Sequence, residues 1–222
     1  MKKVVFALFI STILTQFSVA NGAPSTTKTK NTTKKATVSY SGKAIVNDSQ
    51  LCDFAVKNDL LNMKLSFKKH NYSNDQVDMR CKYGNSLLMI AVNAGNYQTT
   101  QFLLEHGADV NQQNFANQTP LHILARSTKS NSSDLLDLLL RVRNVDVDIQ
   151  DTEGYTPLMR AIDFENINAI SKLLNAGSNV NIKNNYGYSA IDLATKNMKD
   201  KKTNDEIAVS KVIIGLLQHG KK

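Results

Sequence analysis

Residues 107–122 read GADVNQQNFANQTPLH, and parts of this stretch recur along the chain in three registers. Its valine is one of four that lie in the same short polar phrase, at spacings of 33, 37 and 33 residues: Val77, Val110, Val147 and Val180. Nine residues after each valine, a hydroxyl residue opens a short apolar run: Ser86, Thr119, Thr156 and Ser189. Leucine pairs form the third register, at residues 103–104, 139–140, 173–174 and 216–217. Three registers that recur together predict an internal structural repeat.

Local chemistry indicates what each repeat contains. Thr119 and Thr156 suit the N-cap of a helix, and Pro120 and Pro157 follow at the first helical position, where proline is favoured. Apolar residues then recur at helical spacing. Glycine follows two of the leucine pairs, where a helix ends in a left-handed residue. Each repeat is therefore predicted to be helix, turn, helix and projecting turn.

At these positions the sequence resembles the ankyrin repeat. The family's Thr-Pro-Leu-His is intact at residues 119–122, and Gly-Ala-Asp-Val-Asn is intact at residues 107–111. The resemblance implies an all-α repeat solenoid of stacked helix-turn-helix units with projecting β-hairpin loops. It also implies that His122 bonds locally and ties adjacent units together. No such unit can bury its apolar face alone, so neighbouring units are expected to stack.

The repeat array is expected to span residues 49–220 as five units: 50–83, 84–116, 117–153, 154–186 and 187–220. The first and last units depart most from the repeat, as expected for units whose outer faces meet water. The third unit carries extra residues between its helices, and the last carries ten extra residues around 197–206. Both insertions are expected to lie in loops between helices, where added length costs little.

The N-terminus has the features of an export signal. Lys2 and Lys3 precede an apolar run over residues 4–14, and a small-x-small site ends at Ala20. We expect residues 1–20 to be a signal peptide cleaved after Ala20, with Ala23 as the alternative. The pattern is typical of bacteria and predicts a periplasmic or secreted protein. No later stretch is long enough to span a bilayer, so no stable membrane insertion is expected after cleavage.

Residues 21–48 are rich in Thr and Lys and are expected to form a flexible leader. The formal net charge of +8 comes mainly from Lys2, Lys3 and five leader lysines, because 20 basic and 19 acidic residues follow from Asp48 onward. A nucleic-acid-binding protein would carry its positive excess on the folded surface. The charge pattern therefore excludes nucleic acid as the expected partner. The leader serves either as a solvated tether or as a contact to an acidic surface.

Motifs of catalysis are missing from the sequence. It contains no nucleophile elbow, phosphate-binding loop or dinucleotide fingerprint. The four histidines form no cluster with metal-ligand spacing. We therefore expect neither a metal, nor a cofactor, nor an enzyme. Cys52 and Cys81 are either a disulfide between the first unit and the next loop, which export would permit, or two separate thiols.

The resemblance implies that partners contact the loop tips and the concave face. The implied tip residues are Arg80, Lys82, Tyr83, Gln113, Phe115, Gln118, Gln150, Thr152, Tyr155, Lys183, Asn185, Tyr186 and Tyr188. Several are aromatic, a residue class enriched at protein interfaces, although a ring can also pack against a neighbouring loop.

The sequence therefore predicts a monomeric, non-enzymatic module that binds another protein. Three classes of role stay open: a periplasmic protective, chaperone-like or inhibitor protein, a secreted effector that binds host proteins, or a structural periplasmic protein.

Overall fold

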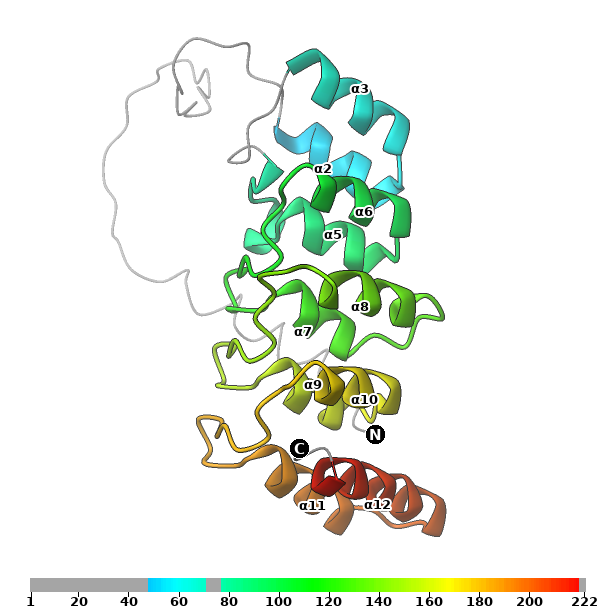
Figure 1. Ribbon diagram of the computed structural model, residues 1–222, viewed down its shortest axis with the longest axis vertical. Coiled ribbons are helices and arrows are strands. Elements are labelled where there is room, and N and C mark those ends of the chain that lie inside the picture. Colours follow the sequence, from blue (N-terminus) through cyan, green and yellow to red (C-terminus); the bar gives the residue numbers. More distant parts are fainter. Residues whose placement is uncertain (1–47, 71–76, 220–222) are drawn as a thin grey trace, which may run out of the picture. The chain divides into compact units, whose positions relative to one another are not determined.

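The computed structural model of the protein describes residues 48–70 and 77–219, which belong to one compact unit. The expected signal peptide, its cleavage site, nearly all of the leader and Gly220 lie outside the described residues. Within the described ranges, ten α-helices follow one another as five pairs. Figure 1 shows the pairs stacked in chain order, with one helix of each pair on the side of the projecting loops and its partner on the other side.

The helices on the loop side are called inner helices here. They are α2 (Asp48–Lys57), α5 (Leu87–Ala94), α7 (Pro120–Ala125), α9 (Pro157–Asp163) and α11 (Ala190–Lys199). The outer helices are α3 (Leu60–His70), α6 (Tyr97–Glu105), α8 (Ser132–Leu140), α10 (Ile167–Asn175) and α12 (Asn204–His219). A short 3-10 turn, η1 (Lys82–Gly84), precedes α5. The all-α repeat solenoid predicted from the sequence is confirmed.

The inner helices begin where the hydroxyl residues predicted them. Ser86 Oγ accepts a hydrogen bond from Met89 N at 3.2 Å, and Thr156 Oγ1 accepts one from Met159 N at 3.3 Å. Pro120 and Pro157 open α7 and α9, where a missing N–H costs nothing. These caps supply partners for backbone donors that the first helical turn leaves unpaired.

Stacking buries the apolar side of every pair. The first leucine of three pairs, at Leu103, Leu139 and Leu173, is fully buried, whereas their neighbours Leu104, Leu140 and Leu174 are only partly buried. One continuous core runs from Leu51 in α2 to Leu217 in α12. Each buried leucine contributes about 2 kcal/mol of transfer free energy, so burial between units is the main stabilising contribution.

Asparagine side chains join successive units at the turn between their two helices. Asn96, at the start of α6, donates its amide to Ala55 O of the preceding unit at 2.9 Å. Asn166, at the start of α10, donates to Ala125 O at 3.2 Å in the same way. Ala55 and Ala125 therefore occupy equivalent places in their units.

The insertion near residues 197–206 differs from its prediction as a loop. Helix α11 continues to Lys199 and α12 begins at Asn204, so most of the inserted residues lengthen the last two helices. Thr203 Oγ1 accepts a hydrogen bond from Glu206 N, and Glu206 Oε2 accepts one from Thr203 N, which caps α12 reciprocally. Local capping therefore favours helix in a stretch that length comparison assigned to a loop.

The projecting loops are closed turns. Arg80 and Ser86 form an isolated bridge, and no strand is found in residues 48–70 and 77–219. Of the helices described, none is long and apolar enough to cross a membrane.

Candidate partner-binding surface

Four turns, called fingers here, project beside the inner helices (Figure 1). They comprise residues 78–85, 109–118, 146–155 and 179–188, which are named fingers 1 to 4. Each tip is closed by one backbone hydrogen bond across four residues. The bonds run from Cys81 N to Asn85 O at 2.7 Å, from Asn114 N to Gln118 O at 3.0 Å, from Asp151 N to Tyr155 O at 2.9 Å and from Asn184 N to Tyr188 O at 3.0 Å.

Three fingers are also organised from within by an Asp or Asn side chain. Asn114, Asp151 and Asn184 each use Oδ1 to accept hydrogen bonds from the backbone N–H groups two and four residues later, at 2.9–3.0 Å. Asp151 and Asn184 are buried. In each of these fingers the side-chain oxygen thus accepts hydrogen bonds from backbone N–H groups of the turn, which fixes the conformation of the tip.

A second set of side chains joins one finger to the next. Arg80 Nη1 donates to Gly84 O at 3.2 Å within its own finger and to Gln113 O at 2.5 Å in finger 2. Gln113 Nε2 repeats the arrangement with Asn117 O at 2.8 Å and, more weakly, Gln150 O at 3.4 Å. Gln150 Nε2 continues it with Gly154 O at 2.5 Å and Lys183 O at 3.0 Å. The sequence interpretation assigned Arg80, Gln113 and Gln150 to partner contact; in the structure these side chains join one finger to the next.

Backbone bonds connect the same tips. Phe115 N donates to Tyr83 O at 3.2 Å, Thr152 N to Ala116 O at 3.1 Å, and Asn185 N to Glu153 O at 3.1 Å. Asn185 also donates its side-chain amide to Thr152 O at 3.0 Å. The fingers therefore form a continuous, hydrogen-bonded edge. Lys82 and Lys183 are exposed along it, whereas Gln118 is partly buried and accepts from Arg126 at 3.4 Å.

Three aromatic rings remain largely exposed on this edge. Tyr83 is 67% exposed, Phe115 is 76% exposed and Tyr186 is 63% exposed. We call these three residues the fingertip rings. Phe115 lies against finger 1, because three of its ring carbons are 2.5–2.9 Å from the place that a Cβ on Gly84 would take. The fingertip rings thus present apolar area on a backbone that is already ordered.

Tyr155 and Tyr188, predicted to belong to the same row, have a different environment. Both are partly buried. The guanidinium of Arg160 lies 4.0 Å from the Tyr155 ring centre, and the ammonium of Lys196 lies 4.6 Å from that of Tyr188. Arg160 is held in place by Asp151 at 2.5 Å and Glu153 at 2.6 Å. These two rings therefore pack against cationic side chains of the inner helices α9 and α11, whereas the alternative considered from the sequence was packing against a neighbouring loop.

His122 links two units from a fully buried position. Thr119 N donates to His122 Nδ1 at 3.1 Å, so Nδ1 is the acceptor and the ring proton lies on Nε2. That Nε2–H donates to Tyr155 O in the next finger at 3.0 Å. Burial lowers the pKa of His122 from 6.5 to about 4, so the ring is neutral at pH 7. The arrangement uses both nitrogens for structure and leaves neither for catalysis.

Sequence reasoning did not single out Arg126, which ends the inner helix α7. Its side chain is partly buried, and Nη2 donates a hydrogen bond to Gln118 Oε1 at 3.4 Å. Burial and the nearby charge of Arg160 lower its pKa, so a carboxylate placed there would be stabilised. The signal in the sequence was a lone basic residue directly after the apolar run of residues 120–125.

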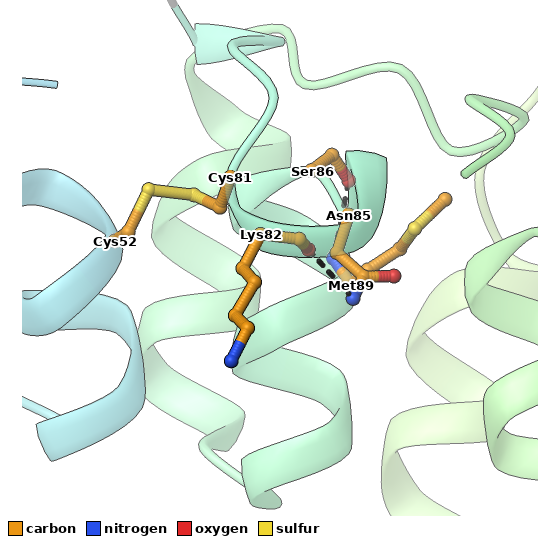
Figure 2. Close-up of a disulfide and its surroundings, with 6 residues drawn as sticks. All are labelled: Cys52, Cys81, Lys82, Asn85, Ser86 and Met89. Carbon is orange, nitrogen blue, oxygen red and sulfur yellow. Dashed lines mark hydrogen bonds between the residues drawn. A yellow bond between two sulfur atoms is a disulfide. The ribbon is translucent and has the colours of Figure 1, made fainter. Parts of the chain in front are cut away.

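The two cysteines are joined in the structure, with their Cα atoms 6.0 Å apart (Figure 2). Cys52 lies on α2, three residues before Ala55, just as His122 lies three residues before the equivalent Ala125. Cys81 closes finger 1 as Asp151 closes finger 3. The disulfide therefore occupies the joint that the His122–Tyr155 hydrogen bond occupies two units later. A covalent bond replaces a hydrogen bond where the terminal unit meets the array.

The arrangement offers an ordered surface of exposed rings and amides. Among the residues that the structure describes, no group of three His, Cys, Asp or Glu side chains could hold a metal ion.

Comparison with protein families gives two matches of one kind. A profile described as "Ankyrin repeats (3 copies)" matches residues 121–208, and one described as "Ankyrin repeats (many copies)" matches residues 70–124. Together they cover more than half of the chain.

Curated relatives match about half of the chain. The human protein "Transient receptor potential cation channel subfamily A member 1" is 31% identical over 105 residues, which is 47% of this chain and 9% of that protein. "Alpha-latrotoxin-Lg1a" of Latrodectus geometricus is 28% identical over 124 residues, or 55% of this chain and 9% of the toxin. The Saccharomyces cerevisiae "Probable 26S proteasome regulatory subunit p28" is 33% identical over 112 residues, or 50% of this chain and 48% of that protein. The chain thus spans less than half the length of each of these relatives.

Proposed function

Because this chain belongs to the ankyrin-repeat family, whose repeats form protein-binding modules, we propose that it binds another protein through the fingertip rings and the adjoining inner helices. The observation that carries this proposal is the exposure of Tyr83, Phe115 and Tyr186 on one hydrogen-bonded edge. Large rings held on an ordered backbone lose little conformational entropy on binding, and aromatic residues dominate the energetics of protein interfaces. The module acts without catalysis.

The protein acts after export, in the periplasm or outside the cell. Two features support this part of the proposal. One is the signal-peptide pattern that ends at Ala20. The other is the pairing of Cys52 with Cys81, because structural disulfides persist mainly in oxidising compartments. In the periplasm the module serves as a protective, chaperone-like or inhibitor partner.

The alternative is a secreted effector that binds host proteins. The eukaryotic and viral origin of these relatives favours it over a purely structural role, since proteins of such organisms carry repeats similar to those of this chain. The two roles differ in compartment. Fractionation of the producing cell with N-terminal sequencing separates them: a chain beginning near Asn21 in the periplasmic fraction supports the first role, and the same chain in the medium or host cell supports the second. An intact Met1 on cytosolic protein would remove both.

Partner binding is tested by replacing all three fingertip rings with Ser. The variant should keep its helical content, because the rings are exposed, and should lose at least about 2 kcal/mol of binding free energy, the size of a hot-spot loss. The matched control replaces Gln98, an exposed residue on the outer helix α6, with Ser. Equal binding by both variants would place the partner elsewhere.

A further inference from the structure

The positive charge of the chain is concentrated before the second repeat. Residues 21–70 contain nine Lys and three Asp, with no Arg or Glu, whereas residues 71–222 contain 16 basic and 16 acidic residues. Four of the nine lysines, Lys57, Lys64, Lys68 and Lys69, belong to α2 and α3. All three Asp lie in the first unit, on α2 and directly before α3, so residues 48–70 carry only one Lys more than Asp. Helix α3 itself holds three of the lysines and no acidic residue. This helix is therefore a basic end on an otherwise neutral array, and it belongs to a different surface from the fingers.

Helix α3 is the outer helix of this first unit and lies at one end of the described stack (Figure 1). It packs through Met63 and Phe67, which are buried, and the Phe67 ring meets the Phe102 ring of α6 with centres 5.0 Å apart. Leu61 and Leu65 lie one turn apart on the opposite side of the helix. They are 68% and 54% exposed, although leucine at the surface of an ordinary end unit would be replaced by a polar residue at no cost.

Lysines extend the same exposed face. Lys68 lies seven residues after Leu61 and three after Leu65, so helical spacing places the three side chains in one stripe. Lys69 lies beside it, and both lysines are exposed. None of the eleven residues of α3 is acidic. We call Leu61, Leu65, Lys68 and Lys69 the cap stripe.

We propose that the cap stripe binds the surface of a bilayer that contains anionic phospholipid. Exposed leucines beside lysines match a helix that lies in the membrane interface, with apolar side chains at the acyl boundary and ammonium groups at the phosphates. An acidic protein could pair with the lysines, but it would not explain why two exposed leucines lie beside them on the same face of the helix. A surface that binds single-stranded nucleic acid usually contains aromatic side chains on which the bases stack, and the cap stripe contains no aromatic residue.

The leader adds a second, purely electrostatic attraction. Five lysines and no acidic residue lie between residues 21 and 47, directly before the first unit in the chain. A polybasic segment near a membrane-binding helix strengthens attachment to an anionic leaflet, because each Lys near the surface is attracted to the anionic lipids. The array would thus be held at a membrane by its first unit while the fingers of the later units remain available to a protein partner.

The proposal is tested by co-sedimentation of the chain beginning at Asn21 with vesicles. Residues 1–20 are omitted because their own apolar run would bind lipid. Vesicles of phosphatidylcholine are compared with vesicles that contain phosphatidylglycerol as well. The protein should pellet with the anionic vesicles only, and added salt should reduce the bound fraction because it screens exposed lysines.

Two variants assign the binding to the cap stripe. Leu61→Ser with Leu65→Ser should reduce the vesicle partition coefficient by about fivefold or more, as expected when apolar anchors are lost. Lys68→Gln with Lys69→Gln should reduce it at low salt. The matched control is Val212→Ser with Lys211→Gln on α12 at the other end of the array, where Val212 is 51% exposed, and it should bind as the parent does.

Circular dichroism confirms that each variant is folded, which the exposure of the replaced residues predicts. Equal binding to neutral vesicles, or normal binding by the Leu61→Ser/Leu65→Ser variant, would overturn the proposal. Binding to polyglutamate without binding to vesicles would also overturn it and would indicate an acidic macromolecule as the partner of the basic end.

Discussion

Removal of the disulfide should weaken the array at its first unit. We consider the double variant Cys52→Ser/Cys81→Ser, which leaves no unpaired thiol. The two cysteines are 29 residues apart, and a closed loop of that size lowers the entropy of the unfolded chain enough to stabilise the fold by about 3.5 kcal/mol. The first unit should be destabilised most, because the disulfide links it covalently to finger 1.

The assay is urea denaturation followed by circular dichroism, with and without dithiothreitol. The parent protein should lose about 3.5 kcal/mol of unfolding free energy when reduced, and the double variant should match the reduced parent in both buffers. Non-reducing mass spectrometry establishes the redox state of each sample. A parent that carries the disulfide and is no more stable than the double variant would refute the reasoning.

Three further predictions concern stability. His122 has a pKa of about 4 when folded and 6.5 when unfolded, so the unfolded chain binds the proton first. The contribution of neutral His122 to the free energy of unfolding is complete above pH 6.5 and decreases as the pH falls toward 4, by up to about 3 kcal/mol. Urea midpoints measured against pH should decrease over this range, and in the His122→Ala variant they should depend less on pH. Leu103→Ala should lower the free energy of unfolding by about 2–5 kcal/mol in the same assay, because the side chain is fully buried. Leu104→Ala should lower it by less, because Leu104 is only partly buried. Gly84→Ala should lower the thermal midpoint more than Gly187→Ala: both residues have a left-handed φ, but a Cβ at Gly84 meets the Phe115 ring and a Cβ at Gly187 meets nothing within 4 Å. Equal losses at the two glycines would mean that Phe115 does not rest on finger 1.

Much of the fold followed from local sequence chemistry. Thr156 and Pro157 marked the start of α9, and Leu173 marked a buried position of α10, because caps and helical periodicity depend on neighbours in the chain. The boundary between α11 and α12 did not follow in this way. Thr203 and Glu206 form a capping pair within the stretch that was assigned to a loop by its length alone.

The surface was harder to predict because its contacts join residues about one repeat apart. Arg80 and Gln113 are polar residues of a kind common at binding surfaces, and each donates a hydrogen bond to a backbone carbonyl of the next finger. Tyr155 belongs to the predicted row, but Arg160, a residue on the following helix, covers its ring. Aligning the units one under another could have found both, since the same positions recur at spacings of 33 and 37 residues.

The central claim, that the fingertip rings contact a protein partner, is tested most directly by site-specific photocrosslinking in the producing cell. A photoreactive phenylalanine analogue is placed in turn at Tyr83, Phe115 and Tyr186, and at Gln98 on the outer helix α6 as the control. We predict that the three fingertip positions give adducts with one and the same protein, identified by mass spectrometry, and that Gln98 does not. Adducts from Gln98 alone, or the same adducts from all four positions, would contradict the account.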